Sequence, residues 1–170
     1  MLKIFCAPLR SQSGSPAVYS LLGYAYRNEY GGVLPEIKKM PGGKPYFPGH
    51  PEIHFSLSHS KTHVLCAISS KPVGADIESP RLISERAVQF FCSPEELSHF
   101  DPLDLWVLKE SYVKLIGGSI ALVKKIRFSC ESGKIITSGT SSLSKLYRIG
   151  NCRAAISTFG DFLPDSVELV

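Results

Sequence analysis

The sequence predicts an α+β protein made of two similar halves. Runs with the apolar spacing of helices alternate with short extended runs that are separated by turn residues. Two of the extended runs, residues 64–69 and 153–158, look alike, and each comes after an earlier helix and strands. We therefore expect an α+β unit that occurs twice, with residues 1–80 as the N-terminal half and residues 81–170 as the C-terminal half.

The N-terminal half begins with a predicted strand at residues 1–8, which is too short and too soon interrupted for a signal peptide. A helix follows, with Ser15 as its N-cap, Pro16 at its first position and Gly31 at its end. After a turn-rich stretch come three extended runs that predict strands, at residues 53–58, 64–69 and 73–78.

Helical spacing returns in the C-terminal half. Residues 84–91 predict a helix capped by its first serine, and Ser93 and Glu96 have the spacing of a capping box. The central helix begins at residues 101–102 and ends at the glycines 117–118; it is apolar on both faces, so we expect it to be covered on both. The last third predicts strands at residues 125–130, 134–137, 143–149 and 152–159.

Composition narrows the class of protein. Apolar residues make up 44% of the chain, charged residues 20%, and no segment approaches the length of a membrane span, so we expect a cytoplasmic protein without a membrane partner. The five cysteines show no spacing typical of zinc sites or disulfide frameworks. A net charge of +4 without a basic stripe argues against nucleic acid and suits an acidic partner or a phosphorylated ligand.

Two acidic clusters lie in settings unusually apolar for surface carboxylates. Asp76 and Glu78 are two residues apart in a predicted strand, so they point to the same side, roughly 6.5–7 Å apart along the chain. Glu110 lies in the middle of an apolar stripe of the central helix, one turn before Lys114. Hard oxygen ligands on a rigid face are what Mg²⁺ requires, although a carboxylate pair alone, or an ion pair between Glu110 and Lys114, is common without any metal.

Two further motifs offer groups that bind phosphate. Lys44 follows two glycines and precedes Pro45, an arrangement that either forms a simple turn or presents one cation on a stiff loop. Ser58 and His59 end a predicted strand, where they are either structural or donors to a phosphate. The chain has neither a P-loop nor a GxSxG motif.

In this order and spacing, the motifs resemble those of the 4′-phosphopantetheinyl transferases of the larger, pseudo-dimeric type. The resemblance covers roughly residues 20–160, and its motifs are residues 43–45 (GKP), 55–60 (FSLSHS), 74–78 (GADIE) and 106–114 (WxxKExxxK). It implies two similar α+β halves related by a pseudo-twofold axis, with the site between them. It also implies transfer of the phosphopantetheine arm of coenzyme A to a serine of an acyl- or peptidyl-carrier protein, with release of 3′,5′-ADP.

The resemblance assigns roles residue by residue. Asp76, Glu78 and Glu110 would hold Mg²⁺, or Mn²⁺, against the diphosphate. Glu110 would also receive the serine proton, directly or through a water. Lys114 would stabilise charge on the transferring phosphate or the leaving group.

Four other residues would bind coenzyme A. The resemblance places Lys44, Ser58 and His59 at its phosphates and adds Ser20 to the same site. Because one chain contains both halves, we expect a monomer with the cleft built within it.

Two alternatives stay open on the sequence. Before Ser20 the only basic residues are Lys3 and Arg10, where the family has a basic cluster, and this favours a module that binds coenzyme A or carrier protein without chemistry. Another Mg²⁺-dependent reaction that cleaves a diphosphate is the rival among enzymes.

Residues 81–100 either cover the sheet as a pair of helices or dock the carrier protein.

Overall fold

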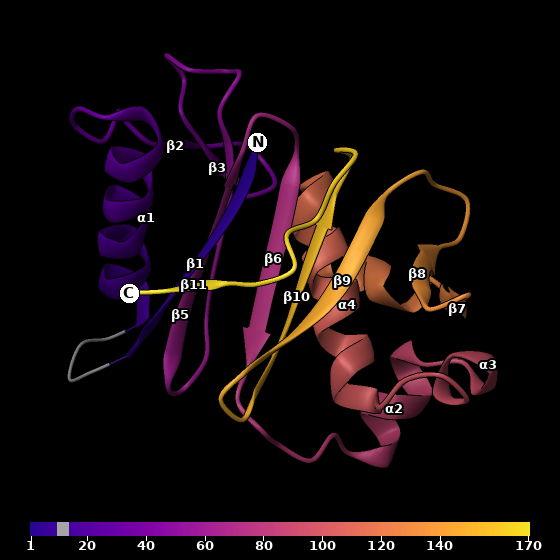
Figure 1. The fold of residues 1–170 in the computed structure, drawn as a ribbon. Helices are drawn as coiled ribbons and strands as arrows, with labels where there is room; N and C mark the ends of the chain where they lie inside the picture. The colour runs from indigo at the N-terminus through magenta and orange to yellow at the C-terminus, as the bar shows by residue number, and fades with distance from the viewer. Residues whose placement is uncertain (10–13) are drawn as a thin grey trace.

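The computed structural model describes residues 1–9 and 14–170 and contains two larger sheets, each covered by one long helix, and a small two-stranded sheet (Figure 1). Arg10 lies outside the described residues. The first part of the chain contains β1 (Leu2–Pro8), α1 (Gly14–Tyr30), β2 (Lys38–Lys39), β3 (Pro45–Tyr46), β4 (His54–His59) and β5 (His63–Ser69). The second part contains β6 (Val73–Glu78), α2 (Glu85–Phe91), α3 (Pro94–Leu97), α4 (Pro102–Ile116), the 3₁₀ turn η1 (Ile120–Lys124), β7 (Phe128–Glu131), β8 (Lys134–Thr137), β9 (Leu143–Ile149), β10 (Cys152–Thr158) and β11 (Glu168–Leu169).

The predicted repeat is present as a repeated topology. The first sheet has the order β11-β1-β5-β4 and the second has the order β6-β10-β9-β8-β7. In each unit the last strand, β5 or β10, pairs antiparallel with the first strand, β1 or β6, and with the strand that precedes it in the chain, β4 or β9. A long helix, α1 or α4, lies in the chain between the first strand and these two. The two runs that look alike in sequence, β5 and β10, are these central strands. By strand pairing, β6 lies in the same sheet as β10, and the boundary at residue 80 stays a prediction.

Three apolar cores hold the layers together. One lies between α1 and the first sheet, one is shared by the inner faces of the two sheets, and one lies between α4 and the second sheet. Figure 1 shows α1 on one side of β1, β5 and β6 and α4 on the other. The apolar residues on both faces of α4 are explained by this packing, because its other face lies against the η1 segment and Phe91.

Local signals placed most helix ends correctly. Ser84 caps α2, Ser93 and Glu96 form the predicted capping box of α3, and Gly117 ends α4 in the left-handed conformation with φ 65°. Two expectations were wrong. α1 begins at Gly14, so Ser15 lies inside the helix instead of capping it, and the strand predicted at 125–130 begins only at Phe128, after η1.

The strand β11 was not expected from the sequence. It runs parallel to β1, pairing Phe5 with Glu168, and the Val170 amide donates to the Cys6 carbonyl oxygen at 2.9 Å. Lys3 and Glu168 add an ion pair of 3.3 Å at the same edge. In the described part of the chain, no helix is both long enough and apolar enough to cross a membrane.

Candidate functional site

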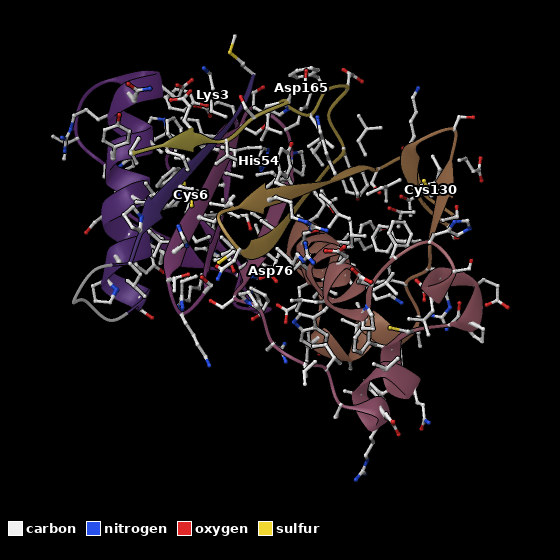
Figure 2. The ribbon with its side chains drawn as sticks, turned by 60° about the horizontal axis from the view of Figure 1, so that its bottom comes forward. Lys3, Cys6, His54, Asp76, Cys130 and Asp165 are labelled. Atoms are coloured by element: carbon white, nitrogen blue, oxygen red, sulfur yellow. The ribbon has the colours of Figure 1, made fainter. Side chains whose placement is uncertain are left out.

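The strand β6 and the helix α4 bring the three predicted carboxylates together. One carboxylate oxygen from each of Asp76, Glu78 and Glu110 lies within 4.8 Å of the others. The close approach depends on Gly74, because a Cβ atom there would collide with the backbone of α4 at Ser111 and Leu115. Figure 2 shows Asp76 between the two halves of the molecule.

Asp76 is 3% exposed, and its two carboxylate oxygens differ. Oδ1 accepts hydrogen bonds from the Ser58 hydroxyl at 2.8 Å and from the Lys114 ammonium at 2.6 Å. Oδ2 is buried and has no hydrogen-bond partner among the described residues. A buried oxygen without a partner is costly, and a bound cation would satisfy it. The three hard oxygen donors therefore fit a divalent cation such as Mg²⁺.

Glu110 is held in a setting that disfavours its charge. Burial, followed by the negative charge of Asp76, raises the pKa of its carboxyl group from 4.5 to about 7. Lys114, whose ammonium lies 3.9 Å from Glu110, acts in the opposite direction. A cation bound between the carboxylates would add the positive charge that this site lacks.

Glu78 is oriented by residues outside the predicted set. The indole nitrogen of Trp106 donates to Glu78 Oε1 at 3.1 Å, and the Arg81 guanidinium lies 3.3 Å from the same oxygen. The guanidinium also lies 5.7 Å from the centre of the Trp106 ring. Oε1 is thereby fixed between two donors, one of which comes from the same helix as Glu110.

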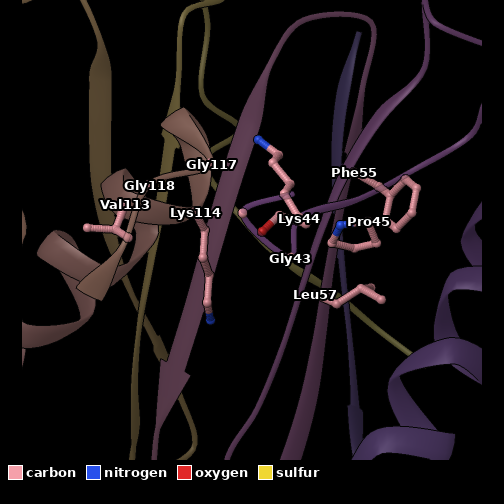
Figure 3. Close-up of a pocket in the computed structure, with 11 residues that line it drawn as sticks. Gly43, Lys44, Pro45, Phe55, Leu57, Val113, Lys114, Gly117 and Gly118 are labelled. Carbon is pink, nitrogen blue, oxygen red and sulfur yellow. The ribbon is translucent and has the colours of Figure 1, made fainter. Parts of the chain in front are cut away.

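A cavity of about 250 Å³ is lined by Lys114, the residue that binds Asp76, and it separates α4 from the loop before β3 and from β4. In Figure 3, Val113 and Lys114 lie on one side of it and Pro45, Phe55 and Leu57 on the other. Its remaining lining comes from Lys44, Ser56 and several glycines, so it combines apolar walls with two ammonium groups.

The Lys44 ammonium binds backbone groups of the protein. It donates to the carbonyl oxygens of Val73, at 3.2 Å, and of Leu115, at 2.7 Å. Burial lowers its pKa from 10.5 to about 8. Lys44 therefore joins the loop before β3 to β6 and to the end of α4.

The remaining predicted residues divide into two groups. Ser58 joins the cluster directly, because its hydroxyl donates to Asp76 and accepts from the Lys114 ammonium at 3.1 Å. His59 is exposed at the end of β4, with its ring beside Gly14 at the start of α1. Ser20 is exposed on α1, where its hydroxyl donates to the Pro16 carbonyl at 3.1 Å. Within the part of the chain that the structure describes, Ser20 makes no contact with Asp76, Glu78 or Glu110.

Several curated proteins are similar in sequence to about half of this chain. A 4′-phosphopantetheinyl transferase of Bacillus subtilis is 39% identical over 90 residues, which cover 47% of this chain and 40% of the relative. The 4′-phosphopantetheinyl transferase Gsp of Aneurinibacillus migulanus is 41% identical over 93 residues, covering 48% and 38%. Over these 90 or so residues, the chain is similar to 4′-phosphopantetheinyl transferases.

The Bacillus subtilis strain 168 transferase Sfp is a further relative, 38% identical over 90 residues. No family model matches the chain. The chain aligns with about two fifths of the length of these curated 4′-phosphopantetheinyl transferases. The mixed α+β fold, with its repeated topology, agrees with the fold class that the sequence predicts.

Ser56 and Arg81 were not predicted from the sequence to be residues of the site. Arg81 contacts Glu78 and Trp106, and Ser56 lines the cavity. The spacing of Ser56 and Ser58 was a usable signal, because residues two apart on a strand share a face. Arg81 and Trp106 lie 25 positions apart in the sequence, so no local pattern predicts their contact.

Proposed function

We propose that this chain transfers the 4′-phosphopantetheine group of coenzyme A to a serine of an acyl- or peptidyl-carrier protein and releases 3′,5′-ADP. The observation that carries the proposal is the convergence of Asp76, Glu78 and Glu110 beside Lys114 and a cavity, with Asp76 Oδ2 buried and unpartnered. The relatives, which are named as transferases of this group, support the same reaction.

The carboxylates of Asp76, Glu78 and Glu110 would hold the cation, Mg²⁺ or Mn²⁺. When bound, it supplies positive charge that neutralises the diphosphate of coenzyme A. Lys114 lies next to Asp76 and Ser58, so its ammonium is placed to stabilise charge on the transferring phosphate.

The reaction forms one bond and breaks one. The carrier serine oxygen attacks the phosphorus that bears the pantetheine arm, and the bond from that phosphorus to the oxygen of 3′,5′-ADP breaks. The serine proton goes to Glu110, directly or through a water.

A transfer assay tests the proposal. The protein is incubated with coenzyme A, Mg²⁺ and apo-carrier proteins of the fatty-acid and peptide-synthesis types, and the carriers are measured by intact mass. We expect a gain of one phosphopantetheine group, which is abolished by a chelator and by Asp76→Asn. Release of 3′,5′-ADP without any gain of mass on the carrier would indicate a different diphosphate-cleaving reaction.

A binding module without chemistry is the second candidate. One observation favours it: the Lys44 ammonium, a group predicted to bind a coenzyme A phosphate, already donates to two backbone carbonyls. The same assay separates the candidates, because a module would bind coenzyme A or carrier protein in calorimetry while no carrier gains mass.

We further propose that the protein acts as a monomer in the cytoplasm. Lys44 and Lys114 line one cavity within a single chain, so this part of the cleft needs no second copy. Light scattering at assay concentrations tests the monomer, and activity that rises with the square of protein concentration would contradict it.

A further inference from the structure

The two sheets meet at strands that form no backbone ladder with each other. β4 is an outer strand of the first sheet and β6 an outer strand of the second. Side chains bridge the gap instead: the Ser56 hydroxyl accepts from the Ala75 amide at 2.9 Å, and the Ser58 hydroxyl accepts from the Ile77 amide at 3.3 Å. The two bonds are spaced two residues apart on both strands.

The amides of Ala75 and Ile77 need these serines. In an antiparallel pair, a strand directs the backbone groups of alternate residues to opposite sides. β6 pairs with β10 on one side, so the amides that reach the serines are those that point away from β10. Both residues are buried, and an amide left unpaired there would cost about 1–3 kcal/mol.

Lys44 completes a row of three bonds along this edge. Its ammonium binds the Val73 carbonyl, which lies two residues before Ala75. It also binds the Leu115 carbonyl at the end of α4, the helix that carries Glu110. The row therefore holds both elements that supply carboxylates, β6 and α4.

Ser56 differs from Ser58 in one respect that makes it informative. Ser58 forms hydrogen bonds directly with Asp76 and Lys114. Ser56 instead accepts a hydrogen bond from the backbone of Ala75, the residue before Asp76. Ser56 is 4% exposed, so its hydroxyl is held in place by its surroundings. Any influence of Ser56 on the carboxylates must pass through the position of β6.

We propose that Ser56 is a positioning residue for the cation site: its hydroxyl fixes the free edge of β6 so that Asp76 meets Glu78 and Glu110. This rests on the proposed function, because it assumes that the carboxylates bind a cation. Residues that orient metal ligands from outside the ligand set commonly change metal affinity 10- to 100-fold when altered, and we expect about 10-fold for Ser56→Ala.

The test measures Mn²⁺ binding by calorimetry without coenzyme A or carrier protein. Ser56→Ala should raise the Kd for Mn²⁺ about 10-fold. The control is Ser69→Ala, which also removes a buried hydroxyl that accepts a backbone amide, that of Lys71 at 3.1 Å. It should lower Tm by a similar amount and leave the Kd unchanged.

A second pair isolates the hydroxyl if Ser56→Ala folds poorly. Ser56→Thr and Ser56→Val introduce side chains of nearly the same shape, but only threonine keeps the acceptor. Threonine should retain Mn²⁺ binding and valine should lose it. Amide exchange followed by NMR supplies a further measurement that needs no cation: the Ala75 amide should be protected in the natural protein and in Ser56→Thr, and exchange faster in Ser56→Ala.

The outcomes separate this proposal from the proposed function. Unchanged Mn²⁺ binding in Ser56→Ala, or equal weakening in Ser69→Ala, would overturn the positioning role while the cation site stands. A natural protein that binds no Mn²⁺ would overturn the site and, with it, the role of Ser56. Fast exchange of the Ala75 amide in the natural protein would show that the bond from Ser56 does not hold the edge.

Discussion

The two units of the fold share a topology but differ in what they bury. In the second unit four charged side chains are buried: Asp76, Glu96, Asp104 and Lys109. In the described part of the first unit, the buried polar residues are serines. The same arrangement of strands and helix therefore supports an interior with buried charges in the second unit and one whose buried polar groups are hydroxyls in the described part of the first.

Most of the buried charges are fully paired. Lys109 donates to Glu96 and to two backbone carbonyls, and both oxygens of Asp104 accept from Arg148 at 2.8 Å. Asp76 differs, since one of its oxygens lacks a partner among the described residues. The comparison teaches that burial of charge alone does not indicate a site; incomplete pairing of a buried charge does.

The largest effect on stability should come from Lys109→Met. It removes the partner of Glu96 inside the protein and should lower the free energy of unfolding by about 3–5 kcal/mol, measured by urea unfolding. The control in the first unit is Lys3→Met, which breaks an exposed pair with Glu168 and should cost about 0–1 kcal/mol. An equal decrease in the free energy of unfolding in the two variants would show that the buried ion pair contributes no more than the exposed one.

Glu110→Gln should have the largest effect on transfer at little cost in folding. We expect the rate to fall about 100-fold or more, because the change removes a ligand and the proton acceptor together. Coenzyme A binding, measured by calorimetry, should largely survive. Glu29→Gln on α1, the helix of the first unit, is the matched control, and a comparable loss there would contradict the assignment.

The stability of the metal-free protein should depend on pH through Glu110. Its pKa is 4.5 ordinarily and about 7 in the folded state, so the folded state holds the proton more tightly. This contribution to stability is complete below pH 4.5 and is lost as the pH rises through about 7, by about 3 kcal/mol at most. Urea unfolding at pH 5 and pH 8 should show the decrease, and Glu110→Gln should remove it.

The smallest effect concerns the carrier protein. Residues 81–100 follow the carboxylates of β6 and combine Arg86 with the exposed side chains of Phe90 and Leu97. If this segment docks an acidic carrier, Arg86→Glu should raise the KM for carrier protein a few-fold and leave that for coenzyme A unchanged, with an effect that weakens at high salt. Arg27→Glu on α1 is the control. Equal effects on both substrates, or none, would place the docking surface elsewhere.

Local sequence signals predicted the elements better than their contacts. The strands β4, β5 and β9 and the caps at Ser84 and Ser93 follow from alternation and from hydroxyl side chains at helix starts, which act within a few residues. β11 could not be predicted in this way. It has two residues, and it exists only because the end of the chain reaches β1.

In the site, too, some contacts could be expected from the sequence and others could not. The meeting of Asp76 with Glu110 could be expected, because both lie in apolar settings and Gly74 allows a close approach. The carbonyl partners of Lys44 could not, because they lie 29 and 71 residues away. Ser20 was placed in the coenzyme A site by the resemblance alone, and nothing in its own surroundings on α1 supports that placement.

The short strand β11 has a consequence for solubility. Without β11, backbone groups at the outer edge of β1 would be unpaired, and such edges join readily to strands of other molecules. β11 occupies part of this edge and places the charge of Glu168 there. Until the last residues of this chain are in place, the first strand is open to aggregation, so shortening the chain by a few residues at this end should promote aggregation before it affects the carboxylates.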